Sequence, residues 1–175
     1  MRAMSASRTG DPLRLRLDHT PVEIERKFLV ATDDWRRSVV RSIDIRDGLI
    51  GVYKDRKVRV RIAAGVATIA IKGPRSGLAR AEYEYEIPLA DAEHMLSTIC
   101  CDDTLEKQRF LVQDCGALWQ VDVYAGLLAG VVIAEIELRR ESQQLQLPEW
   151  IGKEVTGDPS YRKVNMLAQR ARVSS

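Results

Sequence analysis

Acidic and basic residues recur along this chain in groups of like sign, with one residue between successive members. The first group, Glu23 and Glu25, shares with Lys27 one face of a predicted strand over residues 22–28. Successive residues on one face of a strand are roughly 6.5–7 Å apart. Both carboxylates can therefore reach one hard metal ion, or two ions bridged by a ligand. Further groups with this spacing are Arg59 and Arg61; Glu82, Glu84 and Glu86; Lys107 and Arg109; and Glu135 and Glu137.

The charges differ in sign between these groups but not within them. A solvated sheet face usually mixes its signs, because like charges at neighbouring positions repel. Segregated signs are stable where ions bridge them. Paired carboxylates then bind divalent metal, and paired arginines bind a polyanion through bidentate hydrogen bonds. The pattern favours a ligand-binding interior over an ordinary surface.

The elements that must position these groups are strands in which charged and apolar residues alternate. Val58, Val60 and Ile62, for example, lie on the face opposite Arg59 and Arg61. The predicted strands cover residues 22–28, 43–53 with a possible break at Asp47-Gly48, 58–62, 66–72, 80–87, 105–112, 118–124 and 131–138. The fold class is therefore α+β, dominated by an antiparallel sheet. Eight such strands could close into a small barrel. A charged lumen must then hold water and a ligand, because unpaired buried charges are very costly.

Helices are predicted at the start, middle and end of the chain. Thr32 caps a short helix that carries Trp35, Val39 and Val40, and a second helix covers residues 91–100. Asp158-Pro159 begins a last helix that runs to about residue 173. Residues 148–156 are expected to form a loop packed by its Trp and Ile.

Composition narrows the classes of protein that fit. The 175 residues suit one domain over 21–175, preceded by a flexible extension over 1–20. A net charge of +2 is too small for a nucleic-acid binder, and no apolar run is long enough to span a membrane. Three cysteines, two of them adjacent, give no disulfide framework, which favours a reducing cytoplasm. His19 and His94 lack the spacing of a zinc site.

The ligand must carry many negative charges, be narrow and bind together with metal. Because the ligating residues offer only oxygen, Mg²⁺ or Mn²⁺ is expected, as one or two ions. A short linear polyphosphate or the phosphate tail of a nucleotide meets these demands. The sequence has neither a Gly-x-x-x-x-Gly-Lys-Ser/Thr nor a Gly-x-Gly-x-x-Gly motif, so side chains must bind the phosphates.

Eight stretches, in order, resemble a known family. Glu23–Lys27 is similar to the N-terminal Glu-x-Glu-x-Lys signature of the CYTH superfamily, the triphosphate tunnel metalloenzymes. The resemblance covers nearly everything after residue 20 and is nearest to compact bacterial members that hydrolyse inorganic triphosphate. It continues through Val58–Arg61, Ile69–Gly73, Arg80–Glu84, Glu106–Phe110, Trp119–Val123, Ala134–Leu138 and Gly152–Thr156.

The resemblance implies a closed eight-stranded antiparallel tunnel with flanking helices, a C-terminal helix and a division of labour among the charged residues. The expected metal ligands are Glu23, Glu25, Asp122, Glu135 and Glu137. The expected phosphate-binding residues are Lys27, Arg59, Arg61, Lys72, Arg80, Lys107, Arg109 and Lys153. Glu25, Lys107 and Glu137 are the candidate catalytic residues, and Glu82 and Glu84 form an auxiliary acidic pair. Gln120 and Lys163 depart from the family pattern.

The function implied is metal-dependent hydrolysis of triphosphate to pyrophosphate and phosphate by a monomer or homodimer. The base that activates water stays open: the metal ion, a lumen Glu or Lys107 could supply it. Alternatives are adenylate cyclase or thiamine triphosphatase activity, both found in the superfamily, and a non-catalytic polyphosphate-binding module. The paired acids argue against the last, because binding a polyanion needs mostly basic residues.

Overall fold

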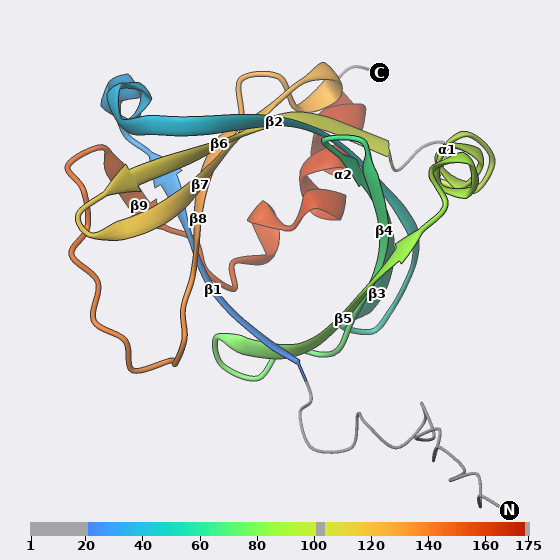
Figure 1. Ribbon diagram of the computed structural model, residues 1–175, viewed down its shortest axis with the longest axis horizontal. Coiled ribbons are helices and arrows are strands. Elements are labelled where there is room, and N and C mark those ends of the chain that lie inside the picture. Colours follow the sequence, from blue (N-terminus) through green and yellow to red (C-terminus); the bar gives the residue numbers. More distant parts are fainter. Residues whose placement is uncertain (1–20, 101–103, 174–175) are drawn as a thin grey trace, which may run out of the picture.

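The computed structural model describes residues 21–100 and 104–173, so the predicted extension over residues 1–20 lies outside the described residues. Strands dominate the described chain (Figure 1). They are β1 (Val22–Val30), β2 (Val39–Tyr53), β3 (Arg56–Ala63), β4 (Val66–Lys72), β5 (Ala79–Ile87), β6 (Thr104–Asp114), β7 (Ala117–Tyr124), β8 (Val132–Glu137) and β9 (Ile151–Glu154). The α-helices are α1 (Leu89–Thr98) and α2 (Lys163–Val173), and short 3-10 helices cover Asp33–Ser38, Gly126–Leu128 and Pro159–Tyr161.

The first eight strands form a closed antiparallel barrel, as predicted. Their order is β5-β4-β3-β2-β6-β7-β8-β1, and β1 pairs back onto β5 to close the ring. The closing register places Glu23 opposite Arg80. Because directly opposed residues point to the same face, this pairing aligns the charged faces of the first and last strands of the ring.

Strand β9 was not predicted: residues 148–156 were expected to be a loop. Ile151–Glu154 instead pair with the second half of β1, beyond the part of β1 that pairs with β5. The following residues also bind β1, since the Val155 N–H donates to the Lys27 carbonyl at 2.8 Å and the Lys27 N–H donates to Thr156 Oγ1 at 2.9 Å. The chain after the barrel thus fixes the backbone of a strand that carries site residues.

Strand β2 differs from its prediction in length and continuity. It begins at Val39, which was assigned to the preceding helix, and it runs without a break through Asp47 and Gly48. A Cβ at position 48 would lie 2.5 Å from Leu96 Cδ2 and 2.7 Å from Cys100 Cβ. Glycine at this position therefore allows α1 and Cys100, which follows α1, to pack directly on the outside of β2. The Asp-Gly pair, which indicates a turn in sequence, here serves close packing.

Two apolar clusters cover the outside of the barrel. In the first, Trp119 packs edge-on against Phe28 and Trp150, with ring centroids 5.7 Å apart in both pairs. In the second, Leu96 of α1 packs on Val60 of β3. With the apolar residues outside, the inner face of the barrel is left for charged side chains.

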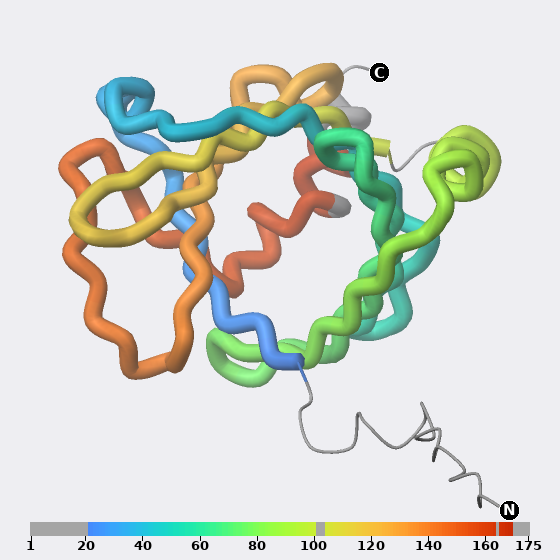
Figure 2. The backbone as a smooth tube through the Cα atoms, in the orientation of Figure 1, coloured from blue at the N-terminus to red at the C-terminus, as the bar shows by residue number. Residues whose placement is uncertain are grey.

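Helix α2 enters the ring of strands (Figures 1 and 2), and a third apolar cluster lies where its side chains meet the strands. Met166 and Leu167 of α2 pack against Leu105, Tyr124 and Ile133. These three strand residues continue the inner faces that carry Lys107, Asp122 and Glu135. Helix α2 therefore fills part of the lumen. None of the helices in the described chain is both long enough and apolar enough to cross a membrane.

Candidate active site

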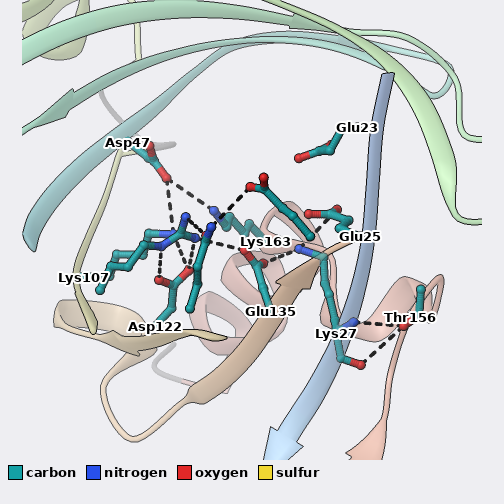
Figure 3. Close-up of polar contacts among 12 residues, drawn as sticks. Glu23, Glu25, Lys27, Asp47, Lys107, Asp122, Glu135, Thr156 and Lys163 are labelled. Atoms are coloured by element: carbon teal, nitrogen blue, oxygen red, sulfur yellow. Dashed lines mark hydrogen bonds and ion pairs between the residues drawn. The ribbon is translucent and has the colours of Figure 1, made fainter. Parts of the chain in front are cut away.

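The barrel encloses a cavity of about 320 Å³ that most of the predicted site residues line. Glu23 and Glu25 extend from β1 toward the same space as Glu135 of β8 (Figure 3). The predicted residues on its wall are Glu23, Glu25, Lys27, Arg59, Arg61, Lys72, Arg80, Arg109, Glu135 and Glu137. The alternation found in the sequence thus corresponds to an inward-facing row on each strand.

Two acids face each other across β1 and β8. Glu25 is the register partner of Glu137, and Lys27 is the partner of Glu135. Carboxylates in directly opposed positions repel each other unless a cation lies between them. Glu25 is buried, whereas Glu137 is exposed at the end of β8. Glu137 accepts a hydrogen bond from Gln120 Nε2 at 3.2 Å, and no Lys or Arg of the described residues forms an ion pair with it.

Glu23 has two basic partners. Lys72 Nζ donates to Glu23 Oε1 at 2.9 Å, and Arg80 Nε donates to Glu23 Oε2. Burial opposes ionisation of this carboxyl, but Lys72 and Arg80 outweigh burial and hold the pKa of Glu23 well below its usual value. Arg80 also donates to Glu25 Oε1 at 3.0 Å, so one guanidinium links both acids of β1.

A second charge cluster surrounds the fully buried Asp122. Arg109 donates to Asp122 through Nε at 2.6 Å and Nη2 at 2.8 Å, and Lys107 donates to Asp122 Oδ2 (Figure 3). Arg109 Nη2 also donates to Glu135 at 2.9 Å, and Glu135 accepts from Lys27. Although burial opposes ionisation of Asp122, its basic neighbours lower its pKa.

Asp122, which accepts from Arg109, and Lys107 do not line the cavity. The side chain of Lys107 is fully buried. Burial lowers the pKa of Lys107 well below its usual value, and the nearby ammonium of Lys163 lowers it further. The catalytic role of Lys107 and the metal-binding role of Asp122 remain predictions.

Asp47 is a central residue of the lumen that the sequence analysis missed. It accepts from Arg61 Nε at 2.7 Å and Nη2 at 3.0 Å, and from Lys163 Nζ at 3.3 Å. Arg59 and Lys107 each place a nitrogen 3.9 Å from its carboxylate. Burial disfavours the ionised form, but Lys163, Arg61 and Arg59 lower the pKa of Asp47 well below its usual value. Ile43, Ile45 and Asp47 share one face of β2, so the spacing in the sequence groups Asp47 with apolar residues and did not identify it.

Six further basic residues line the cavity without having been predicted as site residues: Lys54, Arg56, Lys57, Arg75, Arg162 and Lys163. Lys57 of β3 is the register partner of Lys72. Burial and the surrounding cations Arg80, Lys163, Lys27 and Lys72 lower the pKa of Lys57 to about 7. Lys57 lies in the same alternation as Arg59 and Arg61, which could have identified it, whereas only the fold brings Lys163 and Arg75 into the lumen.

The auxiliary acids and Lys153 lie at other places. Glu82 accepts from Lys72 at 2.8 Å, and Glu84 lies 3.6 Å from Arg59. Burial and the neighbouring Glu23 carboxylate raise the pKa of Glu82, although Lys72 opposes the shift. Lys153 is exposed on β9 and does not line the cavity. The geometry therefore lends no support to phosphate binding by Lys153.

The cavity residues suit a hard divalent cation, although their acids are paired with bases. Within residues 21–100 and 104–173, no three His, Cys, Asp or Glu side chains are already grouped to hold a metal ion. The donors are carboxylate oxygens, the type that Mg²⁺ and Mn²⁺ prefer. The opposed pair of Glu25 and Glu137, with Glu23 beside Glu25, provides the place where a cation would relieve repulsion.

The fold and the cavity together define a closed β-barrel whose lumen is lined by ordered rows of acids and bases. Residues 21–165 match the CYTH domain, and the chain belongs to this family. The resemblance carried by the strand motifs is thereby confirmed.

Two relatives extend over most of the chain. An inorganic triphosphatase of Acetivibrio thermocellus is 42% identical over 145 residues, which cover 83% of this chain and 92% of the relative. An inorganic triphosphatase of Nitrosomonas europaea is 33% identical over 144 residues, covering 80% and 93%. The crystal structure of an inorganic triphosphatase superposes with a TM-score of 0.61 at 30% identity, and covers 83% of this chain and 97% of its own.

Proposed function

We propose that this protein hydrolyses inorganic triphosphate to pyrophosphate and phosphate, with Mg²⁺ or Mn²⁺ as cofactor. The charge balance of the lumen carries the proposal. Of the described residues that line the cavity, twelve are Lys or Arg and seven are Asp or Glu. This excess of positive charge in and around the cavity favours the binding of an anion. The relatives named inorganic triphosphatase support the same substrate.

The size of the cavity supports a substrate that is little more than phosphate. About 320 Å³ is at the lower end of the range for small-molecule sites. A nucleotide would need additional space for its base and ribose. This favours triphosphatase activity over adenylate cyclase activity.

The chain's own residues would bind and orient the phosphates. Arg59, Arg61 and Lys72 lie on neighbouring strands β3 and β4, and Arg80 faces them from β5, so a linear anion can bind several of them at once. Glu23, Glu25, Glu135 and Glu137 would hold the cation, which when bound neutralises phosphate oxygens and lowers the pKa of water.

In the reaction, the oxygen of a water molecule attacks a terminal phosphorus in line with the bridging oxygen. The bond from that phosphorus to the bridging oxygen breaks, and pyrophosphate leaves with the bonding electron pair. The guanidinium and ammonium groups stabilise the charge that develops on the transferred and leaving groups. Because Asp47 and Asp122 hold Arg61 and Arg109 through bidentate contacts, these cations are oriented before substrate binds.

One assay with alternative substrates tests the proposal. Purified protein is incubated with Mg²⁺ or Mn²⁺ and triphosphate, ATP or thiamine triphosphate, and released phosphate, cyclic AMP and retained ligand are measured. We expect rapid release of phosphate from triphosphate. Cyclic AMP from ATP, preferred cleavage of thiamine triphosphate, or retention of intact triphosphate would each contradict it. We also propose a cytoplasmic location, because three cysteines, two of them adjacent, give no disulfide framework.

A further inference from the structure

Arg75 reaches a predicted metal ligand from a loop. It lies in the hairpin between β4 and β5, and its Nη2 donates a hydrogen bond to Glu25 Oε1. Its Nη1 donates to the Leu78 carbonyl at 2.9 Å. The side chain is 21% exposed and lines the cavity. The guanidinium of Arg75 therefore binds, inside the cavity, an oxygen of a carboxylate that is a predicted cation ligand.

The backbone of the hairpin positions Arg75 there. The Leu78 carbonyl that accepts from Arg75 also accepts from the Glu25 N–H at 3.4 Å. The Leu78 N–H donates to Glu141 Oε1 at 3.1 Å, which ties the hairpin to the segment after β8. The hairpin is thus bound on two sides, and the long Arg75 side chain is the part of it that can move most easily.

Glu25 Oε1 already has several cationic neighbours. Arg80 Nη2 donates to it at 3.0 Å, and Lys27 Nζ lies 3.5 Å away. A carboxylate oxygen held in this way can bind a hard cation only if at least one of these groups moves away. Arg80 is also bonded to Glu23 and belongs to a strand, whereas Arg75 has one carboxylate partner and a loop backbone.

We propose that Arg75 occupies Glu25 until this carboxylate binds a divalent cation. Arg75 then leaves Glu25, and its guanidinium turns to the phosphates in the same cavity. This inference rests on the proposed function and adds the residue that couples cation binding to substrate binding. Because such coupling is reciprocal, the bound cation increases the affinity for triphosphate, and triphosphate increases the affinity for the cation.

The test measures Mn²⁺ binding without triphosphate, by the electron paramagnetic resonance of free Mn²⁺, in the wild-type protein, Arg75→Gln and Arg75→Lys. With its competitor removed, Glu25 should bind Mn²⁺ at least about five-fold more tightly in Arg75→Gln. Arg75→Lys retains the positive charge, but an ammonium cannot contact Leu78 and Glu25 in the geometry of the planar guanidinium. The Kd of this variant for Mn²⁺ should therefore lie between those of the wild type and Arg75→Gln. In steady-state assays with triphosphate, Arg75→Gln should raise KM more than it lowers kcat.

Arg61→Gln is the matched comparison for the cation titration. It removes one positive charge from the same lumen, but Arg61 contacts Asp47 and none of the carboxylates on β1. If Arg61→Gln tightens Mn²⁺ binding as much as Arg75→Gln, the effect is general electrostatics and the proposal for Arg75 is overturned. If Arg75→Gln does not fold, Arg75→Lys decides, since unchanged Mn²⁺ binding there also overturns the proposal. Failure of the proposed function would appear separately, as wild-type protein that releases no phosphate from triphosphate.

Discussion

At the scale of single residues, ion pairs between neighbouring side chains balance much of the charge in the lumen. Most of its carboxylates have a basic partner, as in the contacts of Glu23 with Lys72 and of Asp122 with Arg109. Glu137 differs, since its polar partner is the amide of Gln120. Glu137 is therefore an acid that the proposed cation could bind without displacing a base.

Glu137→Ala should lower kcat for triphosphate by at least about 100-fold, because the carboxylate opposite Glu25 is lost at the transition state. As Glu137 is exposed, the free energy of unfolding should change by less than about 0.5 kcal/mol. Phosphate release and denaturant unfolding measure the two effects. Glu86→Ala, an exposed acid of β5 that does not line the cavity, is the control. Near wild-type rates at saturating Mg²⁺ would show that Glu137 does not hold the cation.

Lys57 should make triphosphate binding depend on pH. Its pKa of about 7 is below the usual lysine value, so the side chain is cationic below pH 7 and neutral above it. The KM for triphosphate should therefore rise between pH 6 and pH 8 as this positive charge is lost. The protonation of triphosphate also changes in this range, so the comparison is with Lys57→Gln, whose KM should rise less steeply. Parallel pH profiles would exclude Lys57 from substrate binding.

At the scale of elements, strand β2 separates two environments that meet at adjacent residues. Asp47 faces the charged lumen, and Gly48 faces the packed surface under α1. Alternation along a strand permits this arrangement, since successive side chains point to opposite faces. A one-residue shift of β2 would turn Asp47 toward the apolar surface under α1 and Gly48 toward the charged lumen.

Gly48→Ala should destabilise the protein by about 1–3 kcal/mol, because its Cβ would overlap Leu96 and Cys100. Gly51→Ala is a matched control on the same strand, where an added Cβ meets no atom within 4 Å. Chemical denaturation measures both changes. Equal effects of the two substitutions would mean that helix α1 does not constrain β2.

Helix α2 is joined to the lumen by the ion pair between Lys163 and Asp47. Asp47→Asn should lower the free energy of unfolding by about 3 kcal/mol, because several buried cations lose their anion. Lys163→Met should cost less than about 1 kcal/mol, since Asp47 keeps both hydrogen bonds from Arg61. The free energy of unfolding in urea gives both values. A larger loss for Lys163→Met than for Asp47→Asn would show that Asp47 is not the centre of this cluster.

For the whole molecule, the excess of positive charge in the cavity implies that an anion stabilises the fold. Triphosphate at 100 times its Kd should raise the free energy of unfolding by about 2.7 kcal/mol through mass action, provided that it does not bind the unfolded chain. Thermal unfolding in EDTA, with and without triphosphate, measures the part that needs no metal. Sulfate at the same ionic strength is the control, and equal stabilisation by sulfate would argue against a site shaped for a polyphosphate.

The barrel and most of its lumen could be predicted because a strand repeats every two residues, so a row such as Arg59 and Arg61 is visible in the sequence. Asp47 was missed because a single acid beside a glycine resembles a turn. Arg75 and Lys163 lie in a loop and in a helix, where no period indicates the lumen, and only tertiary structure brings them together. Strand β9 was missed for a related reason, since its four residues form a strand only when β1 provides a partner.

The pairing of β1 has a consequence for how the protein assembles. The strand that carries Glu23 and Glu25 forms its ladders with β5, β8 and β9, all of which are synthesised much later. A nascent chain therefore leaves the Glu25 segment of its first strand without its ladder partner until the residues of β8 have emerged from the ribosome. Ring closure and the meeting of Glu25 with Glu137 must then wait for β8, so a truncated polypeptide that lacks this strand should have no partial activity.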